Sequence, residues 1–164
     1  MRATIPNKPI AILLRMLDEA YDHRAWHGTN LRGSLRGLNA RQAAWRPAPR
    51  RHNIWEEAVH TAYWKYAVWR RLTGEKRGSF ALEGSNWFAR PADPATEAAW
   101  RADLALLERA HRRLRAAVQE LSAVELGRRA RGVKTTPFDL ILGVAYHDVY
   151  HAGQIQLLKR LQKR

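Results

Sequence analysis

Two histidines near the C-terminal end of the chain, His147 and His151, stand four residues apart. On an α-helix, side chains at this spacing are neighbours, with about 5–6 Å between their Cβ atoms. Two imidazoles can then bind one divalent ion at about 2.0–2.1 Å each. Adjacent polar rings in a core are costly when their nitrogens lack partners, and a metal satisfies both rings at once. We therefore interpret the pair as metal ligands, in preference to core histidines that bond only to protein groups.

A second pair, His23 and His27, has the same spacing, so spacing alone does not select the metal site. The residues around this pair are mostly polar or small, which places it at the edge of its apolar stripe. We predict that His23 faces solvent and that His27, like the nearby Trp26, lines a pocket. His52 lies in a polar segment and His111 lies among arginines, and both are predicted to be exposed.

His60 is the expected third ligand, because it lies near the core boundary of another predicted helix. Three imidazoles leave an open position for water or substrate, which is typical of catalytic zinc. Glu57 could bond the far nitrogen of a ligand histidine or act as a base, although a solvated surface carboxylate is an equally good interpretation. Gln154 shares the expected face of His147 and His151 and is a further candidate for lining the pocket. Because the chain has no cysteine, thiolate ligands and a cysteine nucleophile are excluded.

Apolar residues at alternating steps of three and four predict long helices. The first is expected from about Pro9 to Gly37, with Gly28 inside it. Asn53 and Glu56 form a capping-box pattern for a second helix that reaches about Leu72 or Gly74.

Proline at the first helical position predicts the starts of the other two long helices. Asp93 is the expected N-cap before Pro94, and Thr136 is the expected N-cap before Pro137. The last helix is expected to reach about Leu161.

Short capping-box patterns at 39–42 and 122–125 precede the second and fourth long helices by the same interval. This repetition suggests two helix pairs related by an approximate internal twofold, with 75–92 as the connection between them. We predict an all-α protein, a four-helix bundle with a long crossover between two helix pairs, and a single domain over 1–164.

The chain is strongly basic, with 29 Lys and Arg against 15 Asp and Glu and a net charge of +14. Such an excess can indicate a nucleic-acid partner, but the cations are spread along the whole chain, which favours a solvated basic surface. The apolar stretch 10–14 is far shorter than the roughly 20 residues of a membrane span. No cleavable signal is evident. We expect a cytoplasmic protein with no membrane partner.

The run from His147 to Ile155, together with the segment 54–60 that contains His60, resembles the DinB/YfiT-like family of metal-binding four-helix bundles. The segments 26–28 and 45–49 are also similar to this family. The resemblance implies a zinc or nickel ion held by His60, His147 and His151, and frequent homodimers. It also implies a relation to metal-dependent hydrolases and to S-transferases that use a low-molecular-weight thiol such as bacillithiol, mycothiol or glutathione.

Our leading hypothesis is a metal-dependent transferase or hydrolase in which the ion lowers the pKa of a bound thiol or water and presents the anion to a small-molecule substrate. One alternative is a basic nucleic-acid-associated protein that retains the metal for structure. Another is a non-catalytic sensor of a metal or small molecule. The sequence assigns no general base.

Overall fold

The computed structural model describes residues 8–91, 94–129 and 134–163, and these residues form helices and loops without a strand. An isolated bridge joins Ala25 and Gly28. The predicted all-α class is confirmed. The helices are α1 (Lys8–Tyr21), α2 (Leu31–Leu35), α3 (Ala40–Ala44), α4 (Ile54–Thr73), α5 (Glu97–Gln119), α6 (Ala123–Leu126) and α7 (Pro137–Leu161).

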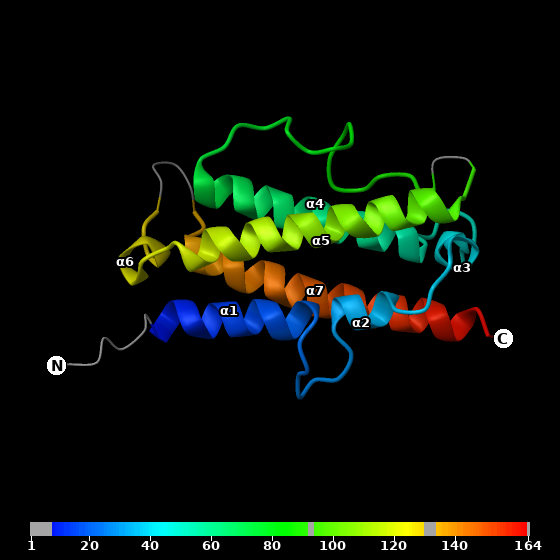
Figure 1. The fold of residues 1–164 in the computed structure, drawn as a ribbon, viewed down its shortest axis with the longest axis horizontal. Helices are drawn as coiled ribbons and strands as arrows, with labels where there is room; N and C mark the ends of the chain where they lie inside the picture. The colour runs from blue at the N-terminus through cyan, green and yellow to red at the C-terminus, as the bar shows by residue number, and fades with distance from the viewer. Residues whose placement is uncertain (1–7, 92–93, 130–133, 164) are drawn as a thin grey trace.

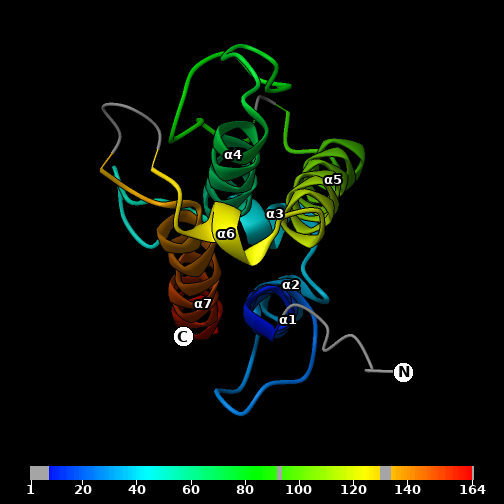
Figure 2. The ribbon, with the colours of Figure 1, turned by 90° about the vertical axis from the view of Figure 1, so that its left-hand side faces the viewer.

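The long helices form a four-helix bundle, as the sequence predicts (Figure 1). The end-on view places α1, α4, α5 and α7 at its four corners (Figure 2). The short α2 continues the line of α1, and both pack against α7, while α4 packs against α5 and α7. The connection between α4 and α5 is the predicted crossover, and it passes over the outer side of α4. This position brings crossover residues close to the α4 side chains.

Local capping determines where most helices begin. The Asn53 side chain accepts a hydrogen bond from the Glu56 amide and Glu56 bonds back, which closes the predicted capping box of α4. Thr136 and Asp139 do the same for α7, with Pro137 at its first position. The short helices α3 and α6 also begin with capping boxes. These four predicted starts are confirmed.

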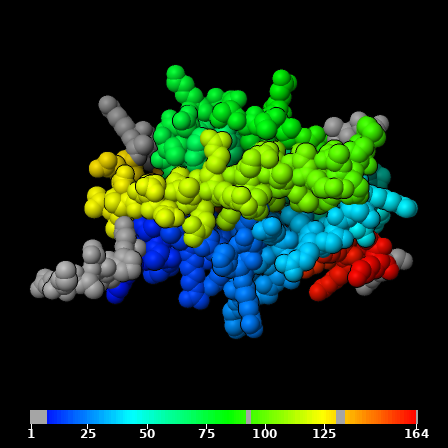
Figure 3. Space-filling view, in the orientation of Figure 1, coloured from blue at the N-terminus to red at the C-terminus, as the bar shows by residue number. Residues whose placement is uncertain are grey.

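The prediction of one continuous helix from Pro9 to Gly37 is wrong. The chain leaves α1 after Tyr21 and forms a loop over 22–30 that projects from the bundle, which Figure 3 also shows. Gly28 has a φ of 102° and therefore lies in the loop. Asn30 then caps α2 by accepting a hydrogen bond from the Gly33 amide. The apolar spacing resumes in α2, so the periodicity continues across residues that are not helical.

The start of α5 differs from the prediction by a few residues. Thr96 is its N-cap, because its side chain accepts from the Ala99 amide. Pro94 lies before the helix, and the predicted cap Asp93 lies outside the described residues. Asp93 and Thr96 are both residue types that can cap a helix, and Thr96, the later of the two, caps α5.

Two apolar clusters hold the four helices in register. At one end, Trp55 of α4 meets Trp100 of α5 edge to face, with ring centroids 5.2 Å apart. At the other end, Leu13, Leu114 and Ile141 are buried between α1, α5 and α7. Burial of such a side chain contributes about 1.5–3 kcal/mol. This packing fixes α4 against α7 and so determines which of their polar side chains meet.

Candidate metal centre

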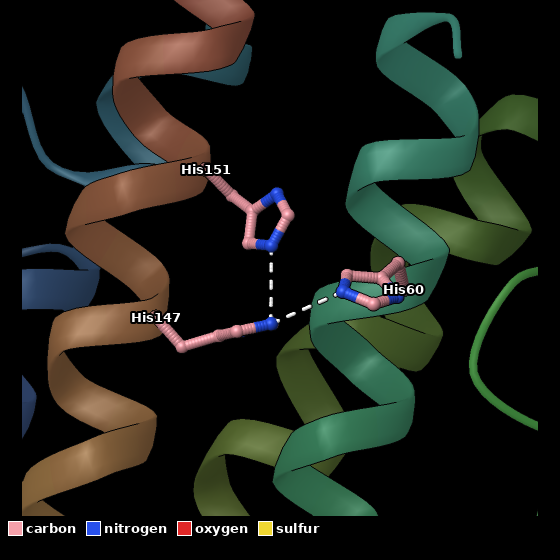
Figure 4. Close-up of side chains that lie close together, drawn as sticks. All are labelled: His60, His147 and His151. Atoms are coloured by element: carbon pink, nitrogen blue, oxygen red, sulfur yellow. Dashed lines mark hydrogen bonds between the residues drawn. The ribbon is translucent and has the colours of Figure 1, made fainter.

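Three histidines from two helices converge on one point between α4 and α7. Figure 4 shows His60 pointing from α4 toward His147 and His151, which both come from α7. Nε2 of His147 lies 3.1 Å from Nε2 of His60 and 3.0 Å from Nε2 of His151. Three ring nitrogens, one from each side chain, therefore face the same small volume.

The far nitrogens of two of these rings are held by protein oxygens. Nδ1 of His60 donates to the Asn86 carbonyl at 2.8 Å, and Nδ1 of His151 donates to the Glu57 carboxylate. Each bond places the ring proton on Nδ1 and leaves a lone pair on Nε2. Glu57 thus bonds the far nitrogen of a candidate ligand, His151, and is itself buried, so it is not a solvated surface carboxylate.

The cluster cannot satisfy all its nitrogens with protons alone. Nε2 of His147 faces the lone pairs of His60 and His151 but carries at most one proton. At least one buried lone pair is left without a donor, whereas a divalent ion accepts all three. Nitrogens bound at about 2.0–2.1 Å in a tetrahedral zinc site lie about 3.3 Å apart. The two spacings from His147 Nε2 are close to this value, and all three nitrogens lie within 4.8 Å of one another. The residues fit a divalent metal.

Burial also keeps the imidazoles of His60 and His147 in the neutral form that binds metals. It lowers the pKa of His60 to about 4 and the pKa of His147 to about 3, since a charged ring is poorly solvated there. Both rings are therefore neutral at pH 7.

The crossover supplies further support for His60. The Trp87 indole stacks on the His60 ring with centroids 3.8 Å apart, and it also stacks on the His52 ring with centroids 3.7 Å apart. Asn86 accepts from His60 through its carbonyl and from Trp64 Nε1 through its side chain at 2.9 Å. Sequence reasoning missed Asn86 and Trp87. The available signal was a tryptophan in a connection that also carries Phe80, Leu82 and Phe88.

A family model described as the DinB superfamily matches residues 21–155. The chain belongs to the DinB superfamily. The matched range contains His60, His147 and His151. No curated protein and no solved structure gives a significant match.

Other predicted site residues of this DinB protein lie outside the cluster. His27 and Trp26 are exposed in the loop between α1 and α2, so neither lines a pocket as predicted. Gln154 is half-buried, and its side chain makes no hydrogen bond within the described residues. Trp64 lines a cavity beside His147.

The predictions of exposure for the other three histidines are correct in two cases and wrong in one. His23 and His52 are exposed, as predicted. The prediction for His111 is wrong, because its ring is buried and stacks on Tyr21 with centroids 3.8 Å apart. The arginines beside it in sequence point along other faces of α5, and the sequence alone did not reveal that position 111 faces inward.

The buried face of α7 is broader than the expected face that carries His147 and His151. His151 is buried and His147 is half-buried, while Asp148, between them in sequence, is fully buried. The two histidines thus lie on the side of the bundle core that faces α4, and Asp148 lies at the centre of the core.

Another cavity, of about 740 Å³, is lined by residues of α1, α2, α5 and the segments that follow α1 and α2, and none of the three histidines lines it. No described helix is long and apolar enough to cross a membrane.

Proposed function

We propose that this DinB protein is a metal-dependent enzyme, a transferase or hydrolase, in which His60, His147 and His151 hold zinc or nickel. One observation carries the proposal. Three imidazole nitrogens face one point, and the rings of His60 and His151 are oriented toward it by hydrogen bonds on their opposite sides.

The bound ion would lower the pKa of a thiol or water so that an anion is available at neutral pH. The protein contributes orientation. Glu57 holds the His151 ring through Nδ1, and the Asn86 carbonyl holds the His60 ring. Three protein ligands leave a coordination position open, as in catalytic rather than structural zinc sites. The cavity beside His147, walled by Trp64, supplies a partly dry approach to that position.

Elemental analysis of purified protein tests the metal assignment. We expect about one zinc or nickel ion per chain, and we expect His147→Ala to lose it because only two ligands then remain. His27→Ala is the matched control, since His27 is exposed in a loop and should leave the metal content unchanged. Equal metal content in His147→Ala and the unmodified protein would contradict the proposal.

A screen of low-molecular-weight thiols with electrophilic acceptors, and of hydrolysable esters and amides, then tests the reaction class. Thiol consumption that depends on the metal supports a transferase, and thiol-independent cleavage supports a hydrolase. Metal retention without turnover in either screen would favour a sensor.

The proposal includes a homodimer with α7 at the interface. Tyr146, Tyr150 and Leu157 lie on one side of α7, and each is more than half exposed. Large apolar side chains grouped on a surface are typical of protein contacts. Light scattering of the purified protein measures its mass, and a monomer at micromolar concentration would contradict this part of the proposal.

A further inference from the structure

An apolar groove leads away from the three-histidine cluster. It is a cavity of about 170 Å³ between α4 and α7, with His147 at one end. Its walls are largely apolar, and its far end carries the charged residues Arg71 and Asp139. The complete lining is Trp64, Val68, Arg71, Asp139, Leu140, Gly143, Val144 and His147. We call this cavity the Trp64 groove.

The helix geometry sets the length of the Trp64 groove. His147 and Leu140 are seven residues apart on α7, and Trp64 and Arg71 are seven residues apart on α4. At 1.5 Å per residue each interval spans about 10 Å. Since α4 and α7 run in opposite directions (Figure 1), Arg71 lies at the end of the groove away from the histidines. A molecule that reaches from the metal to Arg71 must therefore be about 10 Å long.

Arg71 is available to bind an anion. Its side chain is exposed and forms no hydrogen bond or ion pair with any residue that the structure describes. The other charge in the groove is Asp139, and one oxygen of this carboxylate accepts from the Thr136 amide and hydroxyl at 2.8 Å each. Those bonds hold Asp139 in the capping box of α7, and no ion pair joins it to Arg71 in the part of the chain that the structure describes.

The surroundings of Arg71 carry further positive charge. A second cavity, of about 460 Å³ beneath the crossover, shares Trp64 and Arg71 with the groove and adds Arg70 and Arg77. One carboxylate, Glu83, also lines it, and no ion pair to Glu83 forms within the described residues. Three guanidinium groups against one carboxylate make this region attractive to anions, and guanidinium binds carboxylate and phosphate with paired hydrogen bonds.

We propose that the Trp64 groove binds small molecules with three parts: a donor group for the metal, an apolar middle about 10 Å long, and a terminal carboxylate or phosphate held by Arg71. This inference rests on the proposed metal site and names the class of substrate that the site takes. Trp64, Val68 and Leu140 contact the apolar part.

Binding of matched thiols to the cobalt-loaded protein tests the inference, because a thiolate bound to cobalt gives an absorption band that needs no turnover. The probes are mercapto-octanoate, its phosphonate counterpart, and mercapto-octanol, which has the same chain with an uncharged end. We expect one or both anions to bind about tenfold more tightly than the alcohol, since tenfold corresponds to one well-placed interaction. The stronger anion identifies the preferred end group.

Two variants with matched controls examine each part of the groove. Arg71→Gln should remove the preference for the anions and leave the alcohol unchanged, whereas Arg101→Gln, at an exposed position of α5, should change neither. Gly143→Leu should weaken all three probes about tenfold or more, because Gly143 lines the groove and a Cβ added there has no other protein atom within 4 Å. Gly153→Leu is its control, since this exposed glycine of α7 also has open space around it and lies outside the groove.

Equal binding of the anions and the alcohol to the unmodified protein, or no effect of Gly143→Leu, would overturn the inference while the cobalt band still supports the metal site. A protein that retains no cobalt would overturn both the inference and the proposed function.

Discussion

Two clusters of buried polar side chains lie in the same bundle, and they satisfy their polar atoms in different ways. In the three-histidine cluster, three ring nitrogens face one point, and no donor among the described residues lies there to serve all of them. In the second cluster, Lys65 and Asp148 form an ion pair in which both side chains have 0% exposure. One arrangement is suited to a cation from outside, and the other contains its own.

The neighbours of Lys65 strengthen this difference. Its ammonium group lies 5.0 Å from the centroid of the Tyr21 ring, which also stacks on His111. The Tyr21 hydroxyl donates to Glu108 at 2.8 Å. His147 and Asp148 are consecutive residues of α7, yet they belong to different clusters. Within the described residues, Oδ1 of Asp148 and Nδ1 of His111 have no hydrogen-bond partner, but the charge of Asp148 is balanced by Lys65. The comparison teaches that a buried polar cluster indicates a ligand where its groups converge on one shared point, and not because it is buried.

Removing Lys65 should have the largest effect on stability. Lys65→Met leaves the Asp148 carboxylate buried without its counter-charge, and loss of one partner of a buried pair costs about 3–5 kcal/mol. Urea unfolding of metal-free protein measures this loss in the free energy of unfolding.

The double variant Lys65→Met with Asp148→Leu is the control, because it replaces the pair by apolar groups and should be more stable than Lys65→Met alone. A loss below about 1 kcal/mol in Lys65→Met would show that this pair is not the structural element that the comparison requires.

Removing the charge of Glu57 should affect the metal more than the fold. Glu57→Gln weakens the hydrogen bond that orients His151, and loss of such a partner lowers metal affinity about 10–100-fold. Competition with a chelator measures the affinity, and urea unfolding of the metal-free form should show a smaller loss than Lys65→Met. Glu19→Gln, on the partly exposed side of α1, is the control. Unchanged metal affinity would break the distinction between the clusters.

His111 provides the smallest and most specific test, through pH. Burial, with Lys65 and Arg115 nearby, lowers the pKa of His111 to about 2, whereas an unfolded histidine titrates near 6.5. Below about pH 6.5 the unfolded chain therefore binds one proton more than the folded chain at this residue. Its contribution to stability is complete above that pH and falls by about 1.4 kcal/mol for each pH unit below it.

His111→Phe should remove this dependence while keeping an aromatic ring against Tyr21. We expect the unmodified, metal-free protein to lose about 2 kcal/mol more than the variant between pH 6.5 and pH 5, in urea unfolding. The difference between the two proteins isolates His111, because His60 and His147 titrate in both. If the free energies of unfolding of the two proteins changed equally with pH, His111 would gain a proton without cost in the folded state, contrary to this prediction.

The helix ends show how far local sequence reasoning extends. Asn53 with Glu56 and Thr136 with Asp139 carry complete capping boxes, so the starts of α4 and α7 were predictable from a few adjacent residues. The break after Tyr21 was not predictable from periodicity, because α2 returns its leucines to the core in the expected order. A loop that leaves and rejoins the bundle does not change the apolar spacing on either side.

The sequence by itself determined the four-helix class, most helix starts and the candidate ligands His60, His147 and His151, because caps and i, i+4 spacing are short-range properties of one helix. Tertiary structure alone decided that Asn86 and Trp87 hold His60, that Asp148 meets Lys65 and that His111 is buried. Each of these contacts joins residues distant along the chain, so it depends on how the helices and the crossover pack.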